Sequence, residues 1–151
     1  MRAVPLPTAT GAVLVAALLA ACGSAPELSD TELRTRATSA CSAANHQTAR
    51  IPTPHSPTDA ETFLKRGVAA FTPELSRLRA LRPPSDLADV YKTSVDAFSK
   101  KLTALRTTLA SVRRGQDPVV AMQALQRRLA PIEATEDGAW NALQVPACLN
   151  R

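Results

Sequence analysis

The chain has 151 residues, of which 45% are apolar and 21% are charged, and its formal net charge is +5. This length suits one domain, and the apolar fraction is enough for a modest core and too high for a disordered chain. Alanine is frequent, whereas aromatic residues make up only 3% of the chain. This balance favours helices and argues against a β-sandwich or a β-barrel.

A short apolar run lies near the N-terminus. Arg2 precedes the run, which spans residues 12–21. The run is too short to cross a hydrocarbon layer of about 30 Å, but it has the length of a signal-peptide core. It ends in Leu19-Ala20-Ala21-Cys22, and this tetrapeptide resembles the lipobox of bacterial lipoproteins, in particular of small helical envelope lipoproteins of high-GC bacteria.

The resemblance implies an anchor and a location. Residues 1–21 would be removed as a signal peptide, and the Cys22 thiol would carry a diacylglyceryl group that holds the protein on the outer, extracytoplasmic face of the cell membrane. Two acyl chains, palmitate among them, give durable anchoring, whereas one chain is marginal. Residues 22–28 would form the lipidated tether. The alternatives are an ordinary secretory signal with an incidental cysteine, or a retained membrane helix, which the short run disfavours.

The remaining cysteines, Cys41 and Cys148, form an even pair. In an exported protein such a pair predicts a disulfide bond. The alternative is two buried free thiols.

The first amphipathic segment begins at Ser29 or Asp30 and ends at the prolines of residues 52–57. Ser29 and Glu32 have the spacing of a capping box. The apolar stripe of this predicted helix is made of small residues except at its ends: Leu33, Ala37, Ala40 with Cys41, Ala44 and Ile51.

The second segment is predicted to start near Thr58, with Thr58 and Glu61 as its capping box, and to stop at Pro83. Pro73 lies inside it and predicts a kink, or a restart of the helix with Thr72 as its cap. Its apolar face consists of Leu64, Val68, Phe71, Leu75, Leu78 and Leu81.

The third segment has the most regular pattern. Ser85 is its predicted cap, and the helix should end at Arg113 and Arg114 before Gly115. Its apolar positions alternate between steps of four and three from Tyr91 onward, as in a bundle seam: Leu87, Tyr91, Val95, Phe98, Leu102, Leu105, Leu109 and Val112.

The fourth segment opens at Asp117 with Pro118 in the first helical position, and Pro146 stops it. Pro131 predicts a second kink. The expected stripe contains one polar member, Thr135, among Met122, Leu125, Leu129, Ile132, Ala139, Trp140 and Leu143.

Four amphipathic helices with short connectors predict an all-α, up-down-up-down four-helix bundle that spans residues 29–148, followed by a tail of 149–151. This topology puts Cys148 at the end where the first helix begins, whereas Cys41 lies roughly 15 Å along that helix. Since a disulfide allows about 4.4 to 6.8 Å between Cα atoms, the bond requires the first helix to begin late or the fourth helix to bend near Gly138.

The chain carries no motif that predicts catalysis or a cofactor. His46 and His55 lack the Glu three residues earlier that a di-iron bundle uses, and no haem or nucleophile motif occurs. We expect Glu133 and Glu136 to lie on a solvated helix face beside Pro131. The sequence therefore predicts a protein that is not an enzyme and binds no metal.

These observations favour a non-enzymatic binding or scaffolding module that engages a protein or an envelope polymer, with nucleic acid a poor partner for an exported lipoprotein. The alternative is a carrier whose bundle encloses a small apolar ligand, and a third possibility is an enzyme of unrecognised type. The carrier's predicted pocket walls are Phe71, Tyr91, Phe98 and Trp140.

Overall fold

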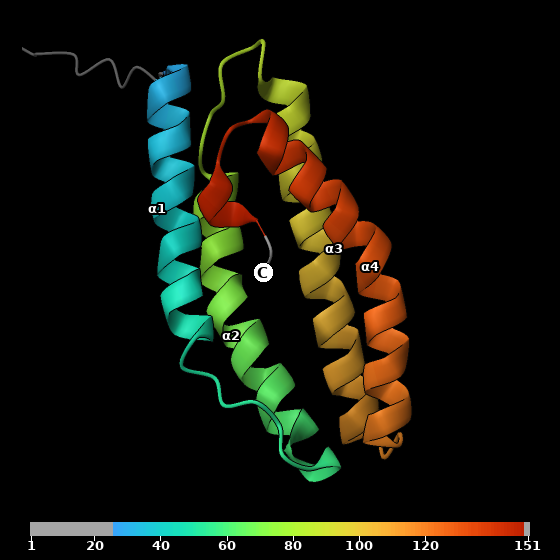
Figure 1. The fold of residues 1–151 in the computed structure, drawn as a ribbon. Helices are drawn as coiled ribbons and strands as arrows, with labels where there is room; N and C mark the ends of the chain where they lie inside the picture. The colour runs from blue at the N-terminus through green and yellow to red at the C-terminus, as the bar shows by residue number, and fades with distance from the viewer. Residues whose placement is uncertain (1–25, 150–151) are drawn as a thin grey trace, which may run out of the picture.

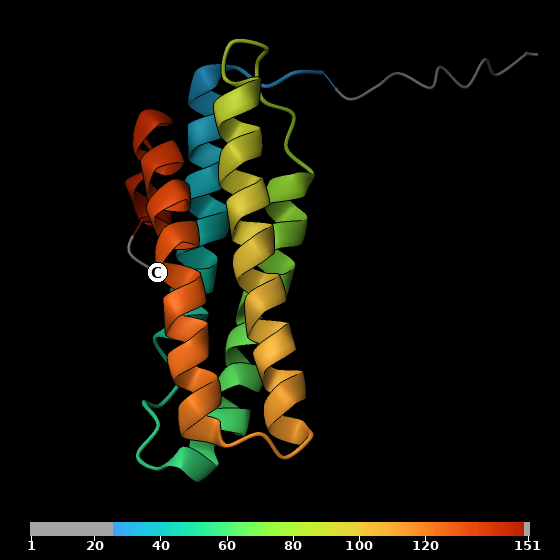
Figure 2. The same ribbon diagram turned by 90° about the vertical axis from the view of Figure 1, so that its right-hand side faces the viewer.

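The computed structural model describes residues 26–149 as four helices packed side by side (Figure 1). The helices are α1 (Asp30–Thr48), α2 (Ala60–Arg79), α3 (Ala88–Arg113) and α4 (Pro118–Ala142), with short 3₁₀ helices η1 (Pro57–Asp59) and η2 (Pro146–Cys148). Consecutive helices run in opposite directions, as the two views in Figures 1 and 2 show. The predicted up-down-up-down four-helix bundle is thus confirmed. The predicted signal peptide and Cys22 lie outside the described residues.

Two of the predicted helix starts are confirmed. At α1, the backbone N–H of Glu32 donates to the Ser29 hydroxyl and the Glu32 carboxylate accepts from the backbone N–H of Ser29, which completes the capping box. At α4, the backbone N–H of Val120 donates to the Asp117 carboxylate over 3.0 Å. These side chains satisfy N–H groups that have no partner within the helix.

The capping pair predicted for α2 is wrong, and the α-helix begins at Ala60, directly after a 3₁₀ turn that includes the predicted start, Thr58. The carboxylate of Asp59 accepts the backbone N–H groups of His55 and Ser56, each over 3.0 Å. The capping pair is therefore Ser56 with Asp59, not Thr58 with Glu61. Pro57 explains the shift, because a proline favours an extended residue before it and starts the turn itself.

The start of α3 is also later than predicted. The backbone N–H of Leu87 donates to the carbonyl of Pro84, and that of Ala88 to the carbonyl of Ser85. Residues 85–87 thus form a turn, and the helix begins at Ala88 without a side-chain cap. The other end is as predicted: Gly115 has a positive φ of 92°, the conformation that ends helices and that glycine adopts without strain.

The internal prolines do not interrupt their helices. α2 continues through Pro73 and α4 through Pro131, so α2 does not restart at Thr72. Both prolines are exposed. Because proline has no backbone N–H, the carbonyl group one turn earlier has no helical hydrogen-bond donor, and at both prolines this carbonyl lies on the side of the helix that faces water. Figure 1 shows α4 changing direction along its length, as a proline in a helix favours.

The larger part of the core lies around Trp140 and Phe98, both with no exposed surface. The rings of Tyr91 and Trp140 meet edge to face with their centroids 5.9 Å apart, and the Tyr91 hydroxyl donates to the carbonyl of Leu78 over 2.7 Å. A second and smaller cluster fills the other half of the bundle: Leu64, Ala104, Leu105, Leu109 and Leu125.

The C-terminal tail folds back along the bundle. After α4, Gln144 adopts a left-handed conformation with φ of 57°, and the backbone N–H of Val145 donates to the carbonyl of Trp140. Two side chains of α1 then hold the tail. Arg34 donates to the carbonyl of Leu143 over 3.0 Å and Asn45 to that of Ala147 over 2.9 Å.

This reversal brings Cys148 to Cys41. The two residues form the predicted disulfide bond, with 5.2 Å between their Cα atoms. Neither rearrangement expected from the sequence is needed, because α1 begins at Asp30 and α4 continues through Gly138 to Ala142. The tail turns after the helix ends, and α1 packs on α2 and on the tail rather than directly on α4.

The lower half of the bundle lacks a full fourth helix. α1 has 19 residues, whereas α3 has 26. Below Thr48 the connector of residues 49–56 continues along the bundle in place of a helix (Figure 1).

We expect Cys148→Ala to lower the free energy of unfolding by about 4 to 5 kcal/mol, because the bond closes a loop between residues 107 positions apart. Urea denaturation measures this loss. The double variant Cys41→Ala/Cys148→Ala should lose a similar amount. A single variant that unfolds at the same urea concentration as the oxidised wild type would contradict the prediction.

Candidate functional site

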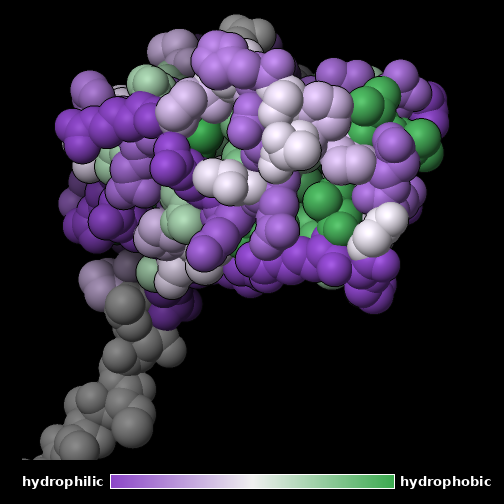
Figure 3. Space-filling model, turned by 90° about the horizontal axis from the view of Figure 1, so that it is seen from below, coloured by the Kyte–Doolittle hydropathy of each residue, from purple (hydrophilic) through white to green (hydrophobic). Residues whose placement is uncertain are grey.

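A half-open cavity of about 350 Å³ lies in the half of the bundle that α1 reaches only with its last residue, Thr48. α2, α3 and α4 supply most of its lining, and Ile51 of the connector supplies part of the outer side. The apolar lining residues are Ile51, Phe63, Leu64, Phe71, Leu105, Met122, Leu125 and Leu129. Figure 3 shows hydrophobic surface in hollows between hydrophilic side chains at this end of the molecule. The volume and the apolar walls are typical of small-molecule sites.

An ionic cluster lies at one end of the cavity. Lys101 of α3 is 3% exposed, and its Nζ lies 2.9 Å from Oε2 of Glu136 and 3.6 Å from Oε1 of Glu133. Glu136 is fully buried, whereas the side chain of Glu133 is 40% exposed. Lys101 and Glu133 line the cavity. One ammonium group therefore lies between two carboxylates of α4.

Burial makes the charge of Glu136 costly. Loss of hydration raises the pKa of Glu136, and the Lys101 ammonium opposes this rise by stabilising the carboxylate. The nearby charges of Asp137 and Glu133 raise the pKa further. Buried ion pairs add little net stability, because the attraction between the ions only offsets their lost hydration.

The prediction that Glu133 and Glu136 share a solvated face is wrong for Glu136. The helical spacing contained the signal, since Glu136 follows Ile132 by four residues and precedes Ala139 by three. Thr135, which we expected in the stripe, is exposed. Glu136 is buried because the helical repeat places its position on the core side of α4, whatever the polarity of the side chain.

Lys101 and Glu74 are two further buried polar residues that the sequence interpretation missed. Lys101 follows Phe98 by three residues and precedes Leu105 by four, which is a core spacing. Glu74 is 1% exposed and has the same spacing between its apolar neighbours in α2. Periodicity alone, applied without regard to polarity, would have placed both inside.

A glycine of α2 faces the cavity. Gly67 lines it, and a Cβ atom at this position would have no atom within 4 Å. Glycine inside a helix costs about 1 kcal/mol relative to alanine. Neither a turn nor a close contact requires glycine here, and its lack of a side chain leaves the cavity open.

The four predicted pocket walls are not brought together around one cavity. Phe71 lines the cavity and contacts the edge of Phe98, with ring centroids 5.6 Å apart. Phe98, Tyr91 and Trp140 belong to the packed core and are not among the lining residues. Burial raises the pKa of the Tyr91 hydroxyl.

The two histidines lie on the surface. His46 and His55 are both exposed. Within residues 26–149, no group of three or more His, Cys, Asp and Glu side chains is placed to hold a metal ion.

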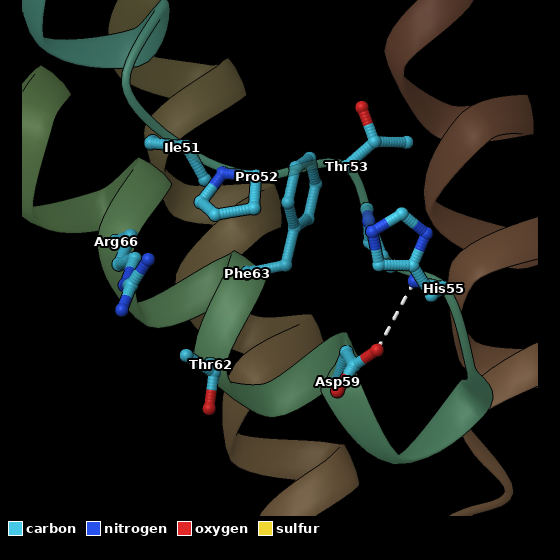
Figure 4. Close-up of a pocket in the computed structure, with 9 residues that line it drawn as sticks. Ile51, Pro52, Thr53, His55, Asp59, Thr62, Phe63 and Arg66 are labelled. Carbon is cyan, nitrogen blue, oxygen red and sulfur yellow. Dashed lines mark hydrogen bonds between the residues drawn. The ribbon is translucent and has the colours of Figure 1, made fainter.

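A smaller hollow of about 200 Å³ lies against the connector (Figure 4). The ring of Phe63 points from α2 toward the connector at Pro52 and Thr53. Phe63 and Ile51 line both this hollow and the larger cavity. These two side chains therefore form a wall that the two hollows share.

Comparison of the chain with protein-family models, with curated proteins and with solved structures finds no match. None of the helices in residues 26–149 has the length and apolar character needed to cross a membrane.

We expect Lys101→Met to lower the free energy of unfolding at pH 7 by about 3 to 5 kcal/mol, because it removes the ammonium beside the buried Glu136 carboxylate. The double variant Lys101→Met/Glu136→Met should recover most of this stability. Urea denaturation of both variants measures the difference.

The loss of free energy of unfolding in Lys101→Met should depend on pH. Because the pKa of Glu136 is raised above 4.5 in the folded state, the folded chain holds this proton more tightly than the unfolded chain does. The free energy of unfolding therefore falls as the pH rises from 4.5 to the raised pKa. Removal of the Lys101 ammonium raises the pKa of Glu136 further, since this ammonium stabilises the carboxylate. The difference in free energy of unfolding between Lys101→Met and the wild type should therefore shrink as the pH falls toward 4.5. A difference that is constant between pH 4.5 and 7 would contradict this assignment.

Proposed function

We propose that this protein is a membrane-anchored, extracytoplasmic binding protein that holds a small apolar ligand within its helical bundle and catalyses no reaction. The observation that carries the proposal is the apolar cavity of about 350 Å³ between α2, α3 and α4. At about 30 Å³ for each water-sized group, this volume admits a ligand of roughly a dozen such groups. The cavity favours this function over a scaffold for a protein or an envelope polymer, which the sequence alone had favoured.

Two features of the lining support a binding role. Gly67 lowers the stability of α2 and leaves space that an alanine would begin to fill. The connector of residues 49–56, which has no regular helix or strand, covers one side of the cavity and can move more easily than a helix. Because the cavity is already half-open, a ligand can enter without opening of the core around Trp140.

The proposed anchor would place the cavity away from the membrane. The lipobox residue Cys22 begins the proposed tether of residues 22–28, which reaches at most about 25 Å when extended. α1 then runs for roughly 28 Å toward the cavity end of the bundle. The arrangement favours a ligand that arrives from the envelope space over one extracted directly from the underlying bilayer.

We expect Gly67→Leu to abolish binding of a fluorescent apolar probe such as N-phenyl-1-naphthylamine, because the leucine side chain enters the cavity. Gly138→Leu is the matched control, since Gly138 also lies within a helix with no atom within 4 Å of an added Cβ and does not line the cavity. Probe fluorescence measures binding. Equal binding by both variants, or no binding by the wild type, would count against the proposal.

For the anchor, we expect Cys22→Ala to release the protein from the membrane fraction into the soluble extracytoplasmic or medium fraction, because the diacylglyceryl group has no other thiol acceptor in the lipobox. Fractionation followed by immunoblotting measures this. Ser24→Ala, beside the lipobox, is the control and should leave the protein on the membrane. Unchanged membrane association of Cys22→Ala would refute lipidation at this residue.

A further inference from the structure

We propose that the cavity selects a single-chain amphiphile with a cationic head group, and that the carboxylate of Glu133 pairs with this head group. This inference rests on the proposed function and names its ligand class. It depends on the charges at one end of the cavity, the free acceptor positions of Glu133 and the apolar residues that lead along α4 to Glu133.

The charges at the ionic end favour a cation. Lys101 supplies one positive charge, and Glu133 and Glu136 supply two negative charges within 3.6 Å and 2.9 Å of its Nζ. Among the lining residues within 26–149, Lys101 is the only basic one. A bound cation would neutralise the excess negative charge. An anionic head group would instead be repelled by the Glu133 carboxylate, because Lys101 is already flanked by the carboxylates of Glu133 and Glu136.

Glu133 is the carboxylate that remains able to bind a ligand. It lines the cavity, its side chain is 40% exposed, and it accepts no hydrogen bond from any residue between 26 and 149. Its contact with Lys101 is 3.6 Å, which is longer than a hydrogen bond. Glu136, by contrast, is fully buried and lies 2.9 Å from the same ammonium. The oxygens of Glu133 can therefore accept the N–H groups of an ammonium ligand while water still reaches the head group.

Apolar side chains follow one helix along the cavity. Along α4 the lining extends from Met122 to Glu133, a rise of roughly 16 Å at 1.5 Å per residue. This row of Met122, Leu125 and Leu129, which leads to Glu133, matches an extended hydrocarbon chain that ends in a polar head group. The head group would lie at Glu133 and the chain would extend along Leu129 and Leu125 toward Met122.

The test uses three probes with the same chain and different head groups: decylammonium, 1-decanol and decanoate. Each is titrated calorimetrically, below its micelle concentration and at pH 7, into the mature chain of residues 22–151 carrying Cys22→Ala, so that neither detergent nor attached lipid competes. We expect decylammonium to bind at least about tenfold more tightly than decanoate, because a charge-assisted hydrogen bond replaces a like-charge contact. Decanol should bind with intermediate affinity.

The variant Glu133→Gln should weaken decylammonium binding about tenfold and change decanol binding by less than about twofold, since only the charge is removed. Glu61→Gln is the matched control, because Glu61 pairs with Arg113 on the surface and does not line the cavity. It should change neither affinity.

The outcomes separate the two proposals. If no probe binds the wild type, the proposed ligand-binding function fails, and the ligand class fails with it. If decanol binds but decylammonium has no advantage, or if Glu133→Gln does not reduce that advantage, the cationic head group is refuted while the apolar binding function stands.

Discussion

The unequal length of the helices is the constraint on which the rest of this structure depends. α1 ends at Thr48, seven residues short of the length of α3, so four helices cannot enclose the core over the whole bundle. At one end the folded-back tail occupies the space between α1 and α4. At the other end only the connector of residues 49–56 covers α2 and α4, and the apolar cavity lies beneath it.

The parts of the fold that the sequence predicts well are those set by local rules. The stripes of α1 and α3, the capping box at Ser29 and the stop at Gly115 depend on residues within one or two turns of each other. The direction of the tail was not predictable in this way. It depends on the left-handed Gln144 and on contacts with Arg34 and Asn45, which lie more than 100 positions away in the chain.

The candidate site was harder to predict because its residues break the rule that core positions are apolar. Lys101 and Glu136 occupy core spacings, yet their polarity suggested a solvated surface. Gly67 has no side chain, so the hydropathy pattern of α2 does not indicate that this position faces a cavity. Around the same cavity the chain therefore keeps a helix glycine and a buried ion pair, both of which stabilise the fold less than an alanine or an apolar pair would. Of the four predicted pocket walls, Phe71 lines the cavity, whereas the other three aromatic residues pack in the core.

The disulfide bond also decides what happens when the chain is cut. Cys41 and Cys148 enclose the connectors before α2, α3 and α4, which are the segments without regular helix and the natural targets of a protease. A single cleavage in any of them opens a covalent ring but releases no fragment, since both pieces remain joined through sulfur. A copy cleaved once in a connector would therefore keep all four helices and its cavity in one covalently joined molecule.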